Sequence, residues 1–488
     1  MSSEPRSNAA LKLYPGLIVA TSAAISAILA ARLILNFRHQ YFLSHVEGAW
    51  LTCAHDFVHG VFYRPLFSPL GYGGTRYFPL YFVLTAIFSK VFGTLQVSAL
   101  VLSAVSVALI CCGAYVWLRR SGVSSLLCLA GVAGILAAAT TQQALLGAKG
   151  DALAAVLNLW GLVLCLKPDT KRGSLYFSAL LFTLAFATKL TTVFGVAAVV
   201  LSWTFARRYK EAVKLGVATA TGYAVVLVTM YVASGGRVFS IFRACASGGG
   251  SLSYTLQAPL HLLSKVIEVD PIFLLLLIPA VAFGVAAFRE NKTDILPIYF
   301  VLALLVSVVI FGSPGIGINH LLDLHVAAIL LMVISISRRP ELFEAGTGIL
   351  ALCLLAACGP AAQALHGDLQ RRSIRDDALE IMTKIPDDGR PVLAENAEVP
   401  LVAGKTPYLL DPFMFRILGV THPELASDFW EKMKHRGFSA VVLQYDPASA
   451  EGKAWYTETH FGGEFLRDLE ANYSFSRTVG QMWVFTPK

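Results

Sequence analysis

Charged residues are scarce in this chain of 488 residues, at 14% of the composition, and several familiar catalytic signatures are absent. The sequence has no phosphate-binding glycine loop, no GxSxG nucleophile motif, no CxxC or paired-histidine spacing and no internal repeat. These absences argue against a P-loop enzyme, a serine hydrolase of the GxSxG type and a metal site of familiar spacing. Hydrophobic residues make up 56% and gather in long apolar runs, which is typical of a polytopic membrane protein.

About eleven of these runs are predicted to span the membrane. The first run, 14–35, is longer than the apolar core of a cleavable signal and has no cleavage site after it, so we expect it to remain as an anchor. The other predicted spans are 95–118, 123–140, 152–166, 174–188, 191–205, 213–233, 271–288, 296–311, 321–335 and 346–365. The 79–92 stretch is too short to cross comfortably and is expected to lie at the outer surface.

Basic residues in the short loops predict the orientation of these spans. Bases are retained on the cytoplasmic side during insertion. Those that fall on one side of this arrangement include Arg119, Arg120, Arg207, Arg208, Arg289, Lys292, Arg338 and Arg339. We therefore expect a multi-pass protein of the cell membrane with a cytoplasmic amino terminus. The loops 36–94 and 235–270 and the carboxyl-terminal segment then lie outside.

The segment 366–488 differs in composition from the membrane domain, 1–365. It holds 14 Lys or Arg against 18 Asp or Glu, which leaves 25 bases and 13 acids for the membrane domain. The excess positive charge is thus mainly an insertion signal, and no nucleic-acid partner is implied. Expected strands at 391–394, 408–411 and 440–444 alternate with helical patterns at 423–435 and 463–473. The sequence predicts a mostly α transmembrane domain followed by a soluble α/β domain.

Six acids of the membrane domain are placed on the outer side: Glu47, Asp56, Asp151, Glu268, Asp270 and Asp323. Carboxylates next to lipid are costly and usually functional. Glu47 and Asp56 are expected on roughly opposite faces of one interfacial helix, so only one of them can face a site. Asp151 follows Lys149 at the outer mouth of the fourth span, and Lys189 lies at another outer turn. These groups are candidates to converge on one cavity.

Simpler structural roles stay open for each of these residues. Asp151 can serve only the dipole at a helix start, and Glu47 can be a solvated loop acid. Lys149 and Lys189 can be interfacial lysines that reach toward water. His320 can be a satisfied polar residue at a helix mouth.

Several segments in order along the chain resemble the membrane glycosyltransferases of the GT-C fold. They are an acidic-Gly-x-x-Leu-x-x-Ala pattern at 47–54, then 60–63, 77–81, 150–153, 187–189 and 317–323, followed in the tail by 394–396, 403–405 and 411–413. The match is similar to the bacterial branch that holds lipopolysaccharide-core and aminoarabinose transferases, and to protein O-mannosyltransferases. It is diffuse but runs nearly end to end, so the order of the segments carries the resemblance.

The resemblance implies transfer of a sugar from a polyprenyl-phosphate donor to an acceptor hydroxyl of a lipid, glycan or protein on the outer face. Glu47 is then the general base, with Asp151 and Asp56 as the next candidates. Arg76 and Lys189 are the leading cations for the donor phosphate. Further substrate-binding candidates are Lys149, Arg243, Tyr81 and His320.

One departure from the family pattern concerns the residue before Glu47. Many of these enzymes carry an acidic pair there, whereas this chain has Val46. A divalent cation stays open as a cofactor, because one or two carboxylates bind hydrated Mg²⁺ without recognisable spacing. The rival functions are a transporter, disfavoured by the lack of repeats, and a membrane-anchored sensor or binding protein, which needs far fewer spans.

Overall fold

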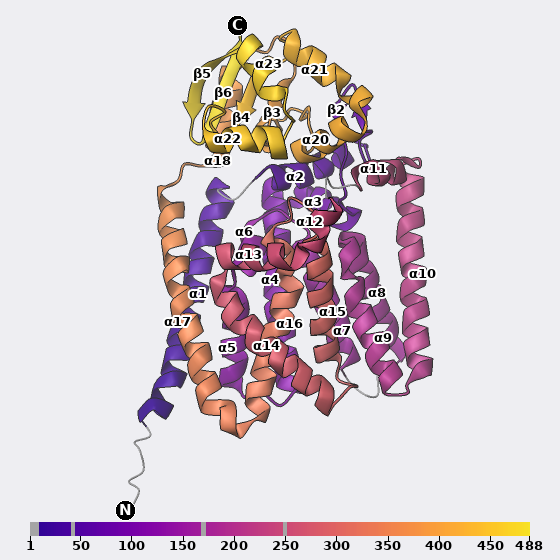
Figure 1. Ribbon diagram of the computed structural model, residues 1–488, viewed down its shortest axis with the longest axis vertical. Coiled ribbons are helices and arrows are strands. Elements are labelled where there is room, and N and C mark those ends of the chain that lie inside the picture. The colour runs from indigo at the N-terminus through magenta and orange to yellow at the C-terminus, as the bar shows by residue number, and fades with distance from the viewer. Residues whose placement is uncertain (1–8, 41–43, 167–171, 247–250) are drawn as a thin grey trace, which may run out of the picture.

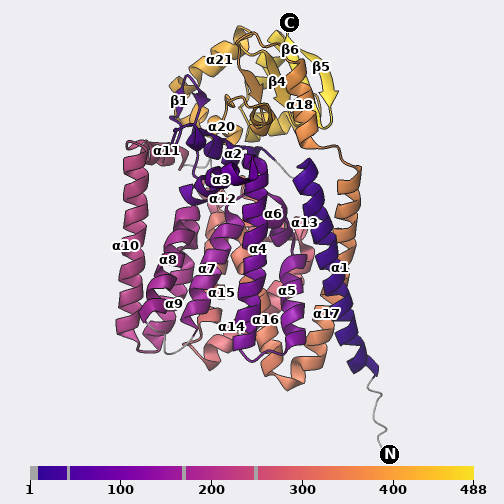
Figure 2. The same cartoon turned by 180° about the vertical axis from the view of Figure 1, so that it is seen from behind.

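The computed structural model describes residues 9–40, 44–166, 172–246 and 251–488. It is a bundle of long helices covered at one end by a mixed α/β domain (Figure 1). The start of α1 lies at the opposite end of the bundle from this domain, and Figure 2 shows the same arrangement from behind. The mostly α architecture with a carboxyl-terminal α/β domain agrees with the fold class predicted from the sequence.

Each of the predicted spans coincides with a helix of the bundle. The helices are α1 (Ala9–His39), α4 (Leu95–Arg120), α5 (Ser125–Ala137), α6 (Ala139–Leu146), α7 (Asp151–Cys165), α8 (Arg172–Thr188), α9 (Val193–Phe205), α10 (Tyr209–Ala233), α14 (Pro271–Glu290), α15 (Ile295–Ile310), α16 (Leu322–Arg338) and α17 (Pro340–Gln370). Within the described residues, six helices are long and apolar enough to cross a membrane, or seven if the bent pair α5 and α6 is one span. The number eleven therefore stays a prediction.

The third predicted span breaks earlier than the sequence indicated. Ala138 adopts an extended backbone, and α5 and α6 meet there at 66°. Asp270 stabilises this break, because its Oδ2 accepts a hydrogen bond of 2.8 Å from the first N–H of α6, at Ala139. Its Oδ1 caps α14 by accepting from Phe273 N at 3.3 Å. The Asp270 carboxylate thus accepts hydrogen bonds from backbone N–H groups in the first turns of two helices, α6 and α14.

Short elements of the two outer loops lie between the bundle and the α/β domain (Figure 1). The first loop forms α2 (His45–Val58), β1 (Phe67–Ser68), β2 (Gly71–Tyr72) and α3 (Pro79–Phe92), and the second forms α11 (Arg237–Cys245), α12 (Leu252–Leu256) and α13 (Ala258–Val269). Two 3₁₀ turns, η1 (Leu190–Thr192) and η2 (Ile318–Leu321), occur at breaks near the same end. Helix α3 has 14 residues and ends at Gly93, whose φ of 81° suits glycine. The short helix expected at 79–92 is therefore present.

The carboxyl-terminal domain is built on a four-stranded sheet in the order β3-β4-β6-β5. Strands β3 and β4 run parallel, and the other pairs are antiparallel. Its elements are α18 (Ile374–Lys384), β3 (Val392–Ala394), α19 (Glu398–Val402), α20 (Pro412–Thr421), η3 (Pro423–Ala426), α21 (Ser427–Lys434), β4 (Ala440–Leu443), α22 (Ala450–Ala454), η4 (Trp455–Thr459), α23 (Phe465–Asn472), β5 (Tyr473–Val479) and β6 (Met482–Pro487).

Both faces of this sheet are covered. Val441 and Leu443 belong to a core that includes residues of α21 and α23, whereas Ala440 and Val442 pack in a second core with α18. The strands expected at 391–394 and 440–444 form as β3 and β4. The strand expected at 408–411 does not form, because only Leu409 makes an isolated bridge, to Tyr72 of the first outer loop.

The first outer loop and the carboxyl-terminal domain share one core. Tyr72 is buried in the domain's hydrophobic cluster and donates its hydroxyl to Leu425 O at 2.6 Å. Arg64 pairs with both oxygens of Asp56 at 2.7 and 2.9 Å and also donates to Pro407 O at 2.7 Å. The α/β domain is therefore fixed to the loop that contains Glu47. Helix α17 extends to Gln370, beyond the domain boundary expected at 365.

Candidate functional site

Glu47 lies in the first turn of α2 and is almost completely buried. The segment Ser44 to Glu47 forms a capping box, in which the Ser44 N–H donates to Glu47 Oε2 at 2.8 Å and the Ser44 hydroxyl contacts the same oxygen. The other oxygen, Oε1, pairs with Lys149 Nζ at 2.9 Å. Val46 packs against the hydrophobic core, so the ionic partner of Glu47 is a lysine from another part of the chain.

Asp151 begins α7 and forms the second carboxylate cluster. Lys189 Nζ lies 2.5 Å from its Oδ1, and Asn319 Nδ2 donates to its Oδ2 at 2.9 Å. Lys189 lies between α8 and η1 and has an extended backbone, and Asn319 belongs to η2. Three breaks in the helical bundle therefore deliver their polar side chains to one point. Such irregular backbone is tolerated at membrane depth where protein covers it.

The two carboxylate clusters are neighbours, because Lys149 and Asp151 flank Gly150. A Cβ at Gly150 would lie 3.2 Å from both Trp50 and Thr188, so glycine allows α2 and α8 to approach here. Burial lowers the pKa of Lys149, but the charges of Glu47 and Asp151 outweigh burial and raise the pKa above its ordinary value. Lys149 is thus a cation at neutral pH. The side chains of Lys149 and Lys189 are 15% and 21% exposed, so water reaches both ammonium groups.

Arg76 is half-buried beside these clusters, and no described residue hydrogen-bonds or ion-pairs with its guanidinium in the part of the chain that the structure resolves. Its charge acts on His320 from one side and on Asp411 of the α/β domain from the other. The adjacent Tyr77 stacks on Trp50 with ring centres 4.1 Å apart. Arg76 is therefore a positive group held between the bundle and the domain with its donors available.

His320 follows Asn319 in the chain and lies close to the same groups. Its Nδ1 is buried and has no hydrogen-bond partner among the described residues. The structure thus brings together six of the residues that the sequence singled out: Glu47, Arg76, Lys149, Asp151, Lys189 and His320.

Three other sequence-predicted site residues lie elsewhere or have their polar atoms engaged. Asp56 is saturated by the bidentate contact with Arg64. The Tyr81 hydroxyl donates to Ala99 O at 3.1 Å and contacts Ser103 Oγ, while its ring packs against Trp50. Arg243 is exposed in the last turn of α11. Asp56 and Tyr81 support the walls of the site in this structure.

The carboxyl-terminal domain contributes residues that the sequence did not reveal. Glu395 is fully buried and accepts hydrogen bonds from Gln444 N, Trp455 Nε1, Tyr456 Oη and His460 Nδ1 at 2.6 to 2.9 Å. The His460 ring meets His45, the first residue of α2, at 4.4 Å between ring centres. Glu398 of α19 is fully buried near Glu47 and Gln96. No local pattern signals these contacts, because the partners of Glu395 are 49 to 65 residues away, and His45 and His460 are several hundred residues apart.

The arrangement does not provide an obvious metal centre. Across residues 9–40, 44–166, 172–246 and 251–488, no group of three His, Cys, Asp or Glu side chains is placed to hold an ion. The positive charge beside Glu47 and beside Asp151 is in each case a lysine ammonium. These donor sets do not fit a resident divalent cation.

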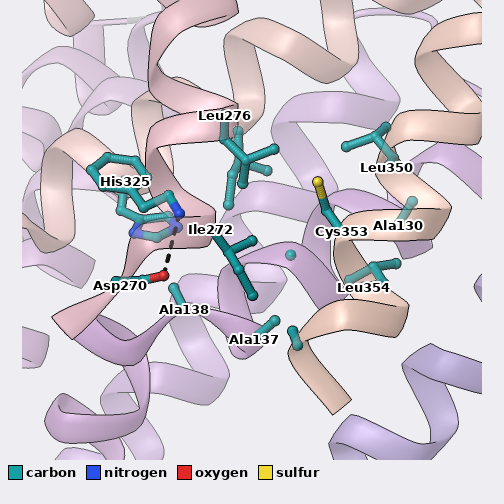
Figure 3. Close-up of a pocket in the computed structure, with 14 residues that line it drawn as sticks. Ala130, Ala137, Ala138, Asp270, Ile272, Leu276, His325, Leu350, Cys353 and Leu354 are labelled. Atoms are coloured by element: carbon teal, nitrogen blue, oxygen red, sulfur yellow. Dashed lines mark hydrogen bonds between the residues drawn. The ribbon is translucent and has the colours of Figure 1, made fainter. Parts of the chain in front are cut away.

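A small apolar pocket lies among α5, α14, α16 and α17 (Figure 3). Leu276, Ile329, Leu350 and Leu354 are among its lining residues, and Asp270 and His325 lie along one side. The His325 ring stacks on Phe273 at 4.0 Å and its Nδ1 contacts Thr140 Oγ1. The pocket is therefore apolar with a polar margin beside the α5–α6 break.

Comparison with known proteins defines the class of fold. The sequence matches no family model and no curated protein sequence. Among solved structures, ArnT from Cupriavidus metallidurans bound to undecaprenyl phosphate aligns over 95% of this chain and 97% of its own, with 12% identity and a TM-score of 0.55. The chain has the GT-C fold of membrane glycosyltransferases, as the sequence resemblance implied.

A second type of neighbour has the same architecture. The archaeal oligosaccharyltransferase AglB from Archaeoglobus fulgidus, in complex with an inhibitory peptide and a dolichol-phosphate, aligns over 96% of this chain and 74% of its own. Identity is 11% and the TM-score is 0.58. The oligosaccharyltransferase of the same organism has also been solved in complex with Zn and sulfate.

Proposed function

We propose that this protein transfers a sugar from a polyprenyl-phosphate donor to an acceptor hydroxyl at the outer face of the cell membrane. The observation that carries the proposal is the pair of lysine–carboxylate contacts, Glu47 with Lys149 and Asp151 with Lys189, beside Arg76, which has no ion-pair partner among the described residues. This combination of bases and cations lies where the bundle of a GT-C fold meets its outer domain. The neighbours bound to undecaprenyl phosphate and dolichol-phosphate support the same class of donor.

The reaction needs a proton acceptor on one side of the sugar and positive charge on the other. Glu47 takes the proton of the acceptor hydroxyl as its oxygen bonds to the anomeric carbon. The bond between that carbon and the phosphate oxygen breaks, and the polyprenyl phosphate leaves as an anion. Arg76 and Lys189 stabilise the charge that develops on the phosphate, and Lys149 holds Glu47 in position.

Asp151 has a supporting role in this scheme and is the alternative base. It holds Lys189 by a charge-assisted contact, and Asn319 fixes its second oxygen. His320 and Lys149 complete the polar wall between the two carboxylates. Asp56 and Tyr81 are buried and support the wall of the site, whereas the exposed Arg243 is assigned to the outer margin, where it contacts the acceptor.

The membrane supplies the donor laterally. The apolar pocket beside the α5–α6 break offers the isoprenoid chain a surface of leucine, isoleucine and alanine side chains. The acceptor, whether lipid, glycan or protein, approaches from the α/β domain and the second outer loop. We place that domain and both loops outside the cell and the amino terminus in the cytoplasm, in keeping with the basic loops at the far end of the bundle.

Purified protein in lipid nanodiscs provides the test. Incubation with a panel of undecaprenyl-phosphate pentoses and hexoses should convert at least one of them to undecaprenyl phosphate in the presence of a membrane extract as acceptor. The same assay with and without EDTA determines whether a divalent cation takes part. Folded protein that consumes no sugar donor, or that moves an intact donor across vesicles, would overturn the proposal.

A further inference from the structure

A second polar contact crosses the bundle below the Asp151 cluster. Asp323, in the first turn of α16, accepts hydrogen bonds at its Oδ1 from Asn158 Nδ2 at 3.0 Å and from Tyr299 Oη at 2.8 Å. Asn158 and Tyr299 are buried, while Asp323 keeps partial exposure. Helices α7, α15 and α16 therefore converge on one carboxylate oxygen and fix its orientation.

Gly195 of α9 makes room for this contact. A Cβ on Gly195 would lie 1.7 Å from Asn158 Oδ1, so any larger residue would displace the amide. Helices α7, α9, α15 and α16 therefore pack around Asn158 and its hydrogen-bond partner Asp323. The amide donates through Nδ2 to Asp323, whereas its buried Oδ1 accepts no hydrogen bond from the described residues. The tight packing against Gly195 therefore limits where the amide can lie.

The charge of Asp323 is not neutralised by an ion pair with any described Lys, Arg or His. Two neutral donors occupy Oδ1, whereas Oδ2 accepts no hydrogen bond from the described residues. Acids within membrane helices are rare, usually face the bundle interior and mark binding pathways. Because Oδ1 is held by two hydrogen bonds, the position of Oδ2 is fixed as well. Oδ2 can therefore accept a hydrogen bond from a ligand.

The position relates Asp323 directly to the proposed site. Asn158 is seven residues after Asp151, on the same face of α7 and about 10 Å further along the helix. Asn319 and Asp323 are separated by four residues, across η2 and the start of α16. The charges of both Lys189 and Asp151 act on Asp323. The Asp151 cluster and the Asp323 contact therefore lie one after the other along the same face of α7.

We propose that Asp323 binds a hydroxyl group of the donor's sugar and so determines which sugar is accepted. The inference rests on the proposed function. The free carboxyl oxygen is a hydrogen-bond acceptor, whereas neither an ionised phosphate nor an isoprenoid chain offers it a donor, so the sugar is the part of the donor that suits it. A site built to accept a hydrogen bond from one hydroxyl discriminates strongly against an analogue that lacks it.

The competing explanation is that the Asp323 contact only braces α7 against α16. In that case its loss weakens the fold and every ligand equally. The two explanations differ in what they predict for a ligand without a sugar. Undecaprenyl phosphate provides that ligand, because it retains the phosphate and the lipid of the donor.

The test measures binding of undecaprenyl phosphate and of the undecaprenyl-phosphate sugar that wild-type protein consumes. Asp323→Asn keeps the side-chain shape but replaces one carboxyl oxygen by an NH₂ group, which cannot accept a hydrogen bond. The two donors and the ligand hydroxyl then compete for a single acceptor oxygen. We expect affinity for the glycosylated donor to fall by about tenfold to a hundredfold, in the range of a charge-assisted hydrogen bond. Binding of undecaprenyl phosphate should stay within about twofold. Tyr299→Phe, which removes one partner of Oδ1 but spares Oδ2, is the matched control and should have the smaller effect.

Deoxy donors keep the inference testable if Asp323→Asn does not fold. Removing the sugar hydroxyls one at a time should identify one analogue that wild-type protein binds at least tenfold more weakly than the parent. Equal binding of all deoxy analogues, or an equal loss of both ligands in Asp323→Asn, would overturn the assignment. Failure of wild-type protein to consume any glycosylated donor would instead refute the proposed function itself.

Discussion

At the scale of single residues, each of the two carboxylates of the candidate site, Glu47 and Asp151, forms an ion pair with a lysine. A buried charge without a partner is strongly destabilising, whereas a paired and hydrogen-bonded charge is tolerated. Glu47 has Lys149 and Ser44, and Asp151 has Lys189 and Asn319. Arg76 differs, because none of the described residues forms an ion pair or hydrogen bond with its guanidinium.

Glu47→Gln tests the proposed base. The amide has the size of the carboxyl but does not accept a proton, so turnover should fall by roughly a hundredfold or more while donor affinity stays within a few-fold. Glu268→Gln is the matched control, since Glu268 is an exposed acid of the second outer loop that pairs with Lys265. Steady-state turnover and donor binding should be measured on both variants. Near-normal turnover in Glu47→Gln would exclude this role and favour Asp151.

Arg76→Ala and Lys189→Ala test the proposed phosphate contacts. Both cations act on the bound donor and on the leaving phosphate, so each variant should weaken donor affinity by about tenfold or more and also slow turnover. Arg76→Lys should restore only part of the loss, because lysine lacks the planar fork of arginine.

Arg237→Ala is the control for these variants, because Arg237 is an exposed cation of the same outer face. Donor affinity and melting temperature should be determined on the same preparations. A lowered melting temperature with intact affinity would show that Arg76 and Lys189 serve the fold alone.

Glu398 predicts a dependence of stability on pH. Burial, and then the charge of Glu47, raise the pKa of this carboxyl well above its ordinary value. The folded protein then retains a proton that the unfolded chain has released, so stability falls as pH rises from about 4.3 toward the raised pKa. Glu398→Gln has no such proton to lose. Its melting temperature should exceed that of wild type by a few degrees at pH 8 and change less between pH 5 and 8.

Glu470→Gln, on the exposed side of α23, should leave this pH dependence unchanged. The measurement is a series of thermal melts in buffers of matched ionic strength. A Glu398→Gln protein that melts below wild type at pH 8 would contradict the interpretation.

At the scale of elements, the helix starts and breaks carry the site. Glu47 and Asp151 stand in the first turns of α2 and α7, where carboxylates interact favourably with the helix dipole. Lys189 and Asn319 lie at 3₁₀ turns beside α9 and α16. Backbone irregularity at one end of the bundle thus positions the groups that regular helices would bury in lipid.

The contact between α2 and α19 joins this end of the bundle to the α/β domain. A Cβ on Gly48 would lie 2.5 Å from Asn396 Oδ1 and 3.1 Å from Ala397 N. Gly48→Ala should therefore force the two elements apart and destabilise the protein by about 1–3 kcal/mol, despite the better helix propensity of alanine. Increased protease cleavage near 371–373 should accompany the loss.

Gly216→Ala on α10 is the control for Gly48→Ala, since no atom lies within 4 Å of the added methyl group. This variant should be as stable as wild type or slightly more stable. A Gly48→Ala protein with an unchanged melting temperature and protease pattern would refute the close packing of α2 on α19.

At the scale of the whole molecule, the α/β domain covers the polar end of the bundle, and α1 begins at the other end (Figure 1). The core of the domain includes Tyr72 from the first outer loop, so the domain is an integral part of the site's enclosure. This arrangement suits a reaction between a donor in the membrane and an acceptor that arrives from outside.

A reporter that is active only in the cytoplasm tests the orientation of the whole protein. Fused after Lys488 it should give no signal, whereas fused after Arg208, in the basic loop between α9 and α10, it should give a strong one. Expression of the two fusions should be compared by immunoblot. A strong signal from the Lys488 fusion would reverse the placement of every proposed site residue.

The sequence alone determined the bundle, because helices of this length and apolarity have few alternatives in a membrane. Each predicted span coincides with a helix, or with the bent pair α5 and α6, and several of the acids and lysines between the spans meet at one end of the bundle. The break at Ala138 was not foreseen, since it depends on Asp270 supplying a cap from 131 residues away. The absence of a strand at 408–411 has a similar cause, because Leu409 pairs with Tyr72 rather than within the domain's sheet.

Only the tertiary structure decided which charged groups meet. Three contacts join separate elements: Glu47 pairs with Lys149, and Asp56 pairs with Arg64. In the third, Asn158 and Tyr299 both donate hydrogen bonds to Asp323. Local patterns set periodicity, caps and turns, whereas such contacts depend on how helices rotate and cross. Hydrophobicity therefore determined which segments form the helices of the bundle, and packing determined which of the few polar groups face one another.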